Sequence, residues 1–256
     1  MIASNKSTSN GPLALSTSGQ GRVVIVGGTG MVGGYALRYA LDNSDVKSVT
    51  SIGRKRLGIQ HPKLKEVLHE NFADCSALAD TLSEQDAAIY CLGTYTGSVS
   101  DAQLRAITAD YTIEFARVLR ASSPNAAFSF LSGYGADPNG KSRLAFARYK
   151  GEAEKALEAG GFPRVYLFRP SYIYPVEPRT EPNFSYRLMR AIYPVSSAFS
   201  KPGDSRRRFG LGNGGRRNDG ASRVGVRKLG VGEPGHQRHR QFAHAAIESR
   251  FRMTEF

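Results

Sequence analysis

The 256-residue sequence is poor in cysteine and contains no long apolar run. Its two cysteines, Cys75 and Cys91, have no metal-ligand spacing and form no disulfide framework. This excludes a metal-stapled or disulfide-stapled small fold and indicates a reduced, cytoplasmic setting. No apolar run approaches the roughly 18 residues that a membrane span requires. We therefore expect neither a membrane span nor a metal site.

The start of the chain lacks the charged segment and apolar core of a secretory signal. We expect residues 1–21 to be a disordered leader, followed by one domain over residues 22–200. Positive charge is concentrated beyond that domain, because residues 201–256 contribute +8 of the net charge of +13. The basicity is therefore mainly a property of this Arg/Gly-rich tail.

Apolar strand-like runs alternate with helical patterns in residues 22–200. This order predicts an α/β protein with a Rossmann-type, doubly wound parallel sheet. The expected strands are 22–28, 46–54, 64–72, 87–93, 126–132 and 164–170. The expected helices are 31–43, a short one over 76–85, a long one that begins with a Ser100–Gln103 capping box, and one that holds Lys150. A loop is expected between the second and third strands.

The stretch VVIVGGTGMVGG places Gly27, Gly30 and Gly33 three residues apart, between a strand and a helix. Such glycines allow a tight turn, close approach of the backbone to a pyrophosphate, and close packing of helix on sheet. The anion then lies at the helix N-terminus. The alternative is a purely structural glycine turn. The predicted cofactor residues of this loop are Gly27, Thr29, Gly30, Met31, Val32 and Gly33.

The second strand ends in SIGRKR, where an acidic residue would bind the ribose hydroxyls of NAD(H). No carboxylate is present, and Arg54, with Lys55 beside it, is suited to a 2′-phosphate. The sequence therefore favours NADP(H) over NAD(H). The alternative is a solvated basic loop.

The chain resembles the atypical short-chain dehydrogenases/reductases, and more narrowly the Tat-interacting-protein family of NADPH-binding proteins and its bacterial relatives. The resemblance covers roughly residues 22–195. It rests on the motifs VGGTGMVGG, SIGRK, NFAD, YCLGTYTG, DYTIEFA, FLSGYGAD, KGEAE and LFRPSYIY, in this order.

The resemblance implies further cofactor contacts. Asn71 and Phe72 would meet the adenine, and Lys150 would hold the nicotinamide ribose. Core packing is the alternative role for Phe72 and Cys91. The segments expected to border the ribose and the nicotinamide are Cys91, Leu92 and Gly93 after the fourth strand, and Pro170 and Ser171 after the sixth.

The chain departs from the family in its catalytic set. The resemblance implies a tyrosine four residues before Lys150, and this position holds Phe146. Tyr149 points about 100° around the helix from Lys150 and cannot simply substitute. Where the family has two hydroxyl residues after the fifth strand, this chain has Ser132 and Gly133.

A relocated acid is one interpretation of these departures. Tyr134 follows the fifth strand, and Tyr172 and Tyr174 follow the sixth, on the edge where a substrate would lie. The candidate catalytic residues are therefore Lys150, Ser132 and Tyr134. The alternative is that these tyrosines line an apolar pocket with their rings.

Three interpretations of the tail remain open. It is a disordered segment that binds nucleic acid or another polyanion, a solvated segment without a partner, or an off-frame translation of a GC-rich gene. The last follows from the resemblance, which implies a strand and a helix closing the substrate side beyond Phe199.

The leading hypothesis is an NADP(H)-binding oxidoreductase-like protein that transfers a hydride to or from a small carbonyl or alcohol. The alternatives are a non-catalytic NADPH sensor that acts through partner contacts, and polyanion binding through the tail. The substrate is left open by the sequence.

Overall fold

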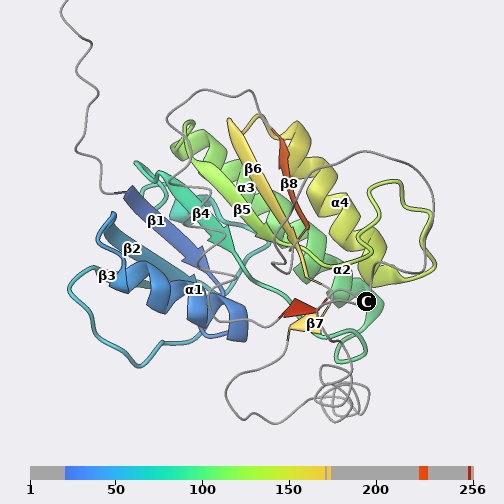
Figure 1. Cartoon of the computed structure of the whole chain (residues 1–256), viewed down its shortest axis with the longest axis horizontal. Coiled ribbons are helices and arrows are strands. Elements are labelled where there is room, and N and C mark those ends of the chain that lie inside the picture. Colours follow the sequence, from blue (N-terminus) through green and yellow to red (C-terminus); the bar gives the residue numbers. More distant parts are fainter. Residues whose placement is uncertain (1–20, 171, 174–224, 230–252, 255–256) are drawn as a thin grey trace, which may run out of the picture.

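The computed structural model of the chain describes residues 21–170, 172–173, 225–229 and 253–254. The predicted leader, except Gly21, and most of the predicted tail lie outside the described residues, as do Ser171 and Tyr174. Figure 1 shows the whole arrangement.

Six parallel strands form the body of the sheet, in the order β3-β2-β1-β4-β5-β6 (Figure 1). Each lies where the apolar runs predicted a strand. The bounds are β1 Gly21–Val26, β2 Val46–Gly53, β3 Leu64–Leu68, β4 Ala87–Tyr90, β5 Ala127–Leu131 and β6 Arg164–Arg169. The predicted Rossmann-type parallel sheet is confirmed.

The helices agree with the sequence patterns in three of four places. Their bounds are α1 Met31–Asp42, α2 Asp101–Arg105, η2 Ala106–Asp110, α3 Tyr111–Ser122 and α4 Ala145–Ala159. The capping box begins α2 as predicted, and one π-type turn, η2, joins α2 to α3. No helix in the described ranges is long and apolar enough to cross a membrane.

The helix expected over residues 76–85 is wrong. Only the 3-10 turn η1, Ser76–Leu78, forms there, and Glu84 has a φ of 56° that no helix accommodates. Leu78 and Leu82 are nevertheless buried, because the turns alone bring them to the core.

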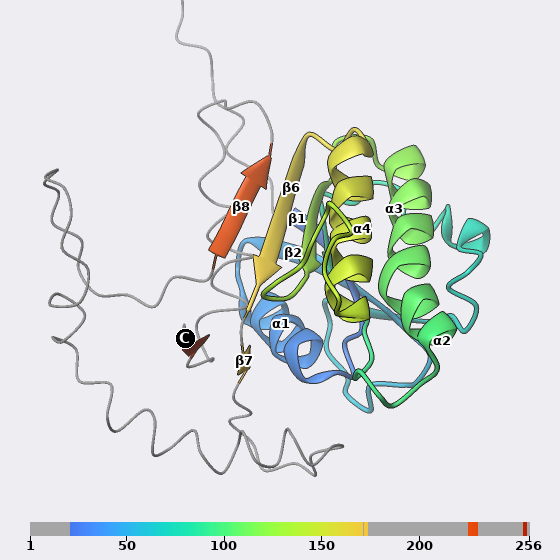
Figure 2. The same cartoon turned by 90° about the vertical axis from the view of Figure 1, so that its right-hand side faces the viewer.

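Helices cover both faces of the sheet, which is the doubly wound arrangement. Val23 and Ile25 of β1 pack on the α1 face, and Val24 and Val26 pack on the opposite face. This alternation follows from the two-residue period of a strand. Figure 2 shows α3 and α4 side by side on that second face, where Phe115 of α3 is fully buried. Burial of such a side chain stabilises the fold by ~1.5–3 kcal/mol.

The order in which strands are added to the sheet reverses between β1 and β4. From β1 the chain passes to β2 and β3 on one side, and β4 then pairs with β1 on the other. In open parallel sheets, ligands bind beyond the carboxyl ends of the strands at such a reversal. The fold therefore directs the search for a site to the loops after β1, β2, β4 and β5.

A strand from the tail extends the sheet. β8, Gly225–Leu229, pairs antiparallel with β6 (Figure 2), and β9, Met253–Thr254, pairs with β7, Tyr172–Ile173. These residues are exceptions to the expected irregular tail. Backbone groups on the edge of β6 can accept a strand without a strong side-chain pattern. The three interpretations of the remaining tail stay predictions.

Candidate functional site

The glycine loop between β1 and α1 is closed by its own backbone. The amide of Gly30 donates to the carbonyl of Gly27 at 2.9 Å, and Gly27 has a φ of 87°. A Cβ on Gly33 would lie 2.1 Å from the carbonyl oxygen of Gly27. Glycine is therefore required at both positions, for the turn and for the close contact.

The N-terminus of α1 has the features of an anion site. Its cap residue, Gly30, provides no side-chain hydrogen bond, and the first turn contains no acidic residue. The first amides of a helix have no partner within the helix and carry partial positive charge. The loop therefore fits the pyrophosphate of a dinucleotide.

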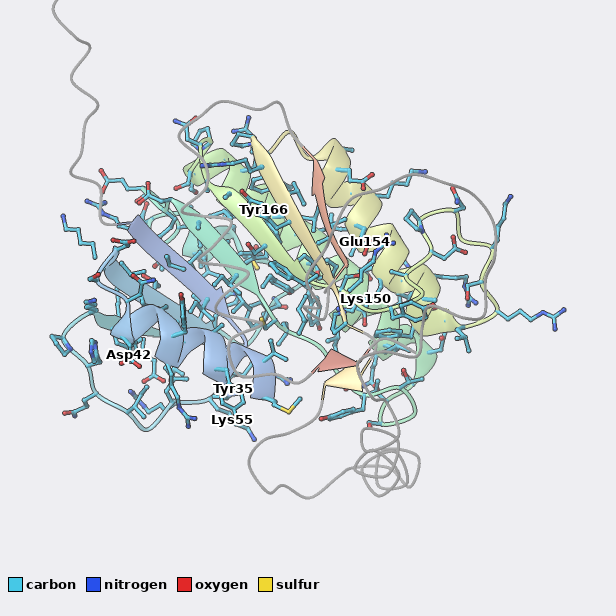
Figure 3. The ribbon with its side chains drawn as sticks, viewed as in Figure 1. Tyr35, Asp42, Lys55, Lys150, Glu154 and Tyr166 are labelled. Atoms are coloured by element: carbon cyan, nitrogen blue, oxygen red, sulfur yellow. The ribbon has the colours of Figure 1, made fainter. Side chains whose placement is uncertain are left out.

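A cavity of about 950 Å³ opens beside this helix end. It runs along α1 to the loops after β2, β4 and β5 and to α4; Figure 3 labels Tyr35 and Lys55 toward one end and Lys150 on α4. Its lining comprises Gly28, Thr29, Gly30, Met31, Val32, Gly34, Tyr35, Leu37, Arg38, Lys55, Arg56, Leu57, Ile59, Cys91, Leu92, Gly93, Thr94, Tyr95, Leu131, Ser132, Phe146 and Lys150.

The basic end of the cavity differs from the sequence-based prediction. Arg54, Lys55 and Arg56 are all exposed, but only Lys55 and Arg56 are among the lining residues. Arg38 of α1 also lines it, with its guanidinium carbon 5.8 Å from the ring centre of Tyr35. Sequence reasoning missed Arg38, although it lies one turn after Gly34 on the same helix face.

Lys150 lies at the other end of the cavity and is 5% exposed. Its ammonium donates to the carbonyl of Leu131 at 2.7 Å and lies 4.5 Å from the ring centre of Phe130. Burial lowers the pKa of Lys150 to about 8. Burial also raises the pKa of the Cys91 thiol to about 12, so this cysteine is a thiol at neutral pH.

Phe146 and Gly133, the two departures from the family pattern, lie against each other. A Cβ on Gly133 would lie 2.9 Å from two ring carbons of Phe146. The ring thus occupies the space that a side chain on residue 133 would need. Neither position supplies a hydroxyl group to the cavity.

Tyr149 does not replace the missing acid. Its hydroxyl donates to a carboxylate oxygen of Asp101 at 2.6 Å, at the start of α2. This hydrogen bond raises the pKa of Tyr149. The expectation that Tyr149 points away from the Lys150 site is confirmed.

The hydroxyl of Ser132 is committed to a buried network. It donates to Oε1 of Glu154 at 2.5 Å, and Arg169 Nε donates to the same oxygen at 2.8 Å. Glu154 is completely buried, and the bond to it raises the pKa of Arg169. Although Ser132 lines the cavity, this geometry favours a structural role.

Other predicted site residues lie away from the cavity lining. Tyr134 is 72% exposed, and its amide donates to the carbonyl of Pro170 at 2.9 Å. Phe72 is buried in the core, as its packing alternative predicted, and Asn71 is exposed. Their cofactor and acid roles remain predictions. Of the predicted set, the cavity brings together Thr29, Gly30, Met31, Val32, Lys55, Cys91, Leu92, Gly93, Ser132 and Lys150.

Comparison with known proteins confirms the resemblance to the Tat-interacting protein type. The chain is 28% identical over 153 residues to Protein HTATIP2 of Rattus norvegicus, covering 59% of this chain and 62% of that protein. It is 29% identical over 157 residues to Protein fmp52, mitochondrial, of Aspergillus niger, covering 59% and 66%. The matched region thus spans about two thirds of these relatives. No protein-family model matches the chain.

Two solved structures share the fold. Gre2 of Candida albicans, in complex with NADPH, has a TM-score of 0.54 at 17% identity and covers 67% of this chain and 65% of its own. WbmH of Bordetella bronchiseptica, in complex with NAD+, has a TM-score of 0.52 at 18% identity and covers 67% and 63%. The cytoplasmic location of this chain remains a prediction, since the fmp52 relative is named mitochondrial.

Proposed function

We propose that this chain is an NADP(H)-binding oxidoreductase of the atypical short-chain dehydrogenase/reductase type. The observation that carries the proposal is a single cavity that joins an uncapped helix N-terminus, a basic end and a buried lysine. The named complexes of Gre2 with NADPH and of WbmH with NAD+ support a dinucleotide in this fold.

The residues present fit such a cofactor from end to end. The amides of Met31 and Val32 at the start of α1 would hold the pyrophosphate. Lys55 and Arg56 would pair with a 2′-phosphate, which is why NADP(H) is proposed over NAD(H). Lys150 would hold the nicotinamide ribose through its ammonium group.

When bound, the reduced nicotinamide supplies a hydride to a carbonyl carbon. The protein's own part is to bind the dinucleotide, to exclude water with the apolar ring of Phe146, and to provide a proton to the developing alkoxide. Reduction of a small aldehyde or ketone needs no protein group beyond these, so this is the proposed substrate class.

A second candidate function is a non-catalytic NADPH sensor. Phe146 and Gly133 favour it, because neither carries the hydroxyl group that the family pattern implies there, and the ring of Phe146 fills the space beside Gly133. In this case the bound cofactor would stabilise a surface to which a partner protein binds.

The test is calorimetric titration of NADPH, then NADH, into the full chain, followed by a screen of NADPH oxidation with aldehydes, ketones and quinones. We expect micromolar NADPH binding, weaker NADH binding, and loss of binding in Lys150→Ala. Binding without turnover of any carbonyl would support the sensor. Absence of binding to either nucleotide would refute both functions.

A further inference from the structure

We propose that Tyr95 is the proton donor that replaces the missing tyrosine at position 146. The proposal rests on the oxidoreductase function above and names the residue that completes it. Tyr95 lines the same cavity as Phe146 and Lys150. None of the sequence motifs had marked it as a catalytic candidate.

The chemistry of the cavity lining favours Tyr95 over its neighbours. Besides Lys150, the lining residues that follow β4 and β5 and carry a transferable proton are Cys91, Thr94, Tyr95 and Ser132. The Ser132 hydroxyl donates a hydrogen bond to Glu154, and burial raises the pKa of the Cys91 thiol to about 12. A threonine hydroxyl is a far weaker acid than a phenol. Since Lys150 is assigned to the nicotinamide ribose, Tyr95 is the side chain best suited to general acid catalysis.

The position of Tyr95 in the fold also favours it over Tyr134. Tyr95 follows β4, which pairs with β1 at the point where the order of strand addition reverses. Ligands of open parallel sheets bind at this point. Tyr134 follows β5, one strand farther from the reversal, and is 72% exposed outside the cavity lining.

The loop that carries Tyr95 is anchored at both ends. At its start, the amide of Cys91 donates to the carbonyl of Val26 at 2.9 Å. Within it, the carbonyl of Tyr95 accepts from the amide of Ser98 at 3.1 Å in a turn. At its end, Asp101 accepts the 2.6 Å hydrogen bond from Tyr149, which neighbours Lys150 on α4. Tyr149 therefore acts as a positioning residue that couples the Tyr95 loop to the lysine helix.

The proposed step transfers one proton from Tyr95 and one hydride to the substrate carbonyl. The O–H bond of Tyr95 breaks, and its proton passes to the carbonyl oxygen of the substrate while the carbonyl carbon receives the hydride. The carbonyl is reduced to an alcohol and the nicotinamide is oxidised. Tyr95 is only half-buried, so its phenolate regains a proton from solvent.

The first experiment needs no turnover. The full chain is nitrated with tetranitromethane, with and without saturating NADPH, and each tyrosine is followed by peptide mass spectrometry. We expect NADPH to protect Tyr95 and to leave the nitration of Tyr134 unchanged, since Tyr134 is exposed and outside the cavity lining. Equal nitration of Tyr95 with and without NADPH, at a concentration that calorimetry shows to be saturating, would overturn the proposal.

The second experiment compares the wild type with Tyr95→Phe and with the control Tyr111→Phe, which loses a phenol hydroxyl packed against the α3 face of the core. The probe is 4-nitrobenzaldehyde, or another carbonyl from the screen that the wild type reduces. Loss of a general acid lowers kcat by about 100-fold or more. We expect this loss in Tyr95→Phe, with unchanged NADPH affinity and little change in KM, and no loss in Tyr111→Phe.

The outcomes separate this proposal from the function on which it rests. Full turnover in Tyr95→Phe would refute Tyr95 as the donor and leave the oxidoreductase function standing. NADPH binding without wild-type turnover of any carbonyl would refute both. A Tyr95→Phe variant that also loses NADPH binding would show a structural role and would equally overturn the proposal.

Discussion

Substitution of Arg169 should destabilise the fold more than substitution of its buried ion-pair partner, Glu154. The Glu154 side chain is completely buried, whereas the Arg169 side chain is 27% exposed. Removal of the arginine therefore leaves a buried carboxylate that keeps its hydrogen bond from Ser132 but has lost its ion-pair partner and has no access to water. Removal of the glutamate charge leaves a guanidinium that still reaches solvent.

The burial of the two side chains sets the expected changes in the free energy of unfolding. Loss of one partner of a buried ion pair costs about 3–5 kcal/mol, and we expect Arg169→Met to fall in this range. Glu154→Gln keeps the side-chain volume and should cost less, about 1–3 kcal/mol. The double variant Glu154→Gln/Arg169→Met should be more stable than Arg169→Met alone, because it removes the uncompensated buried charge.

The assay is urea unfolding followed by far-UV circular dichroism, read as the midpoint at unchanged m-value. The matched control is Glu152→Gln on the same helix. Glu152 pairs with Arg105 at 2.6 Å, but both side chains are at least 40% exposed, so this change should cost about 0–1 kcal/mol. An Arg169→Met variant no less stable than Glu152→Gln would refute the reasoning.

Three further predictions concern the cavity. Gly33→Ala should abolish NADPH binding, because its Cβ would lie 2.1 Å from the Gly27 carbonyl; Gly53→Ala, whose nearest contact is 3.9 Å and which is not among the lining residues, is the calorimetric control. Lys55→Ala should weaken NADPH binding about tenfold with little effect on NADH binding, as expected for the loss of one charged hydrogen bond. Arg54→Ala should change the affinity for neither nucleotide. A larger effect of Arg54→Ala than of Lys55→Ala would contradict the assignment of the 2′-phosphate to the cavity-lining residues. Burial lowers the pKa of Lys150 from 10.5 to about 8, so the unfolded chain binds more protons between these values and folding stability rises with pH there. Relative to Lys150→Met, the wild type should gain on the order of 3 kcal/mol from pH 7 to pH 10.5 in urea unfolding, and a constant difference would show that Lys150 titrates normally.

The order of the strands along the chain was predictable because it depends on local pattern. The six parallel strands and α1 follow from apolar runs and helical periodicity, which each short segment carries by itself. The Ser100–Gln103 capping box likewise acts within four residues. The segment 76–85 was the exception, because only the 3-10 turn η1 forms there and Glu84 adopts a positive φ.

The sequence by itself determined the glycine loop between β1 and α1 and the place of Lys150 on a helix, because glycine spacing and helical period leave few conformations open. Only the tertiary structure decided which groups reach the cavity. It placed Lys55 and Arg56, but not Arg54, in the cavity lining, joined Ser132 to Glu154 across 22 residues, and placed Phe146 on Gly133. It also brought Tyr95 to the cavity that Lys150 lines. The physical reason is that side-chain direction in loops, and contacts between strands and helices far apart in the chain, depend on packing that no local pattern records.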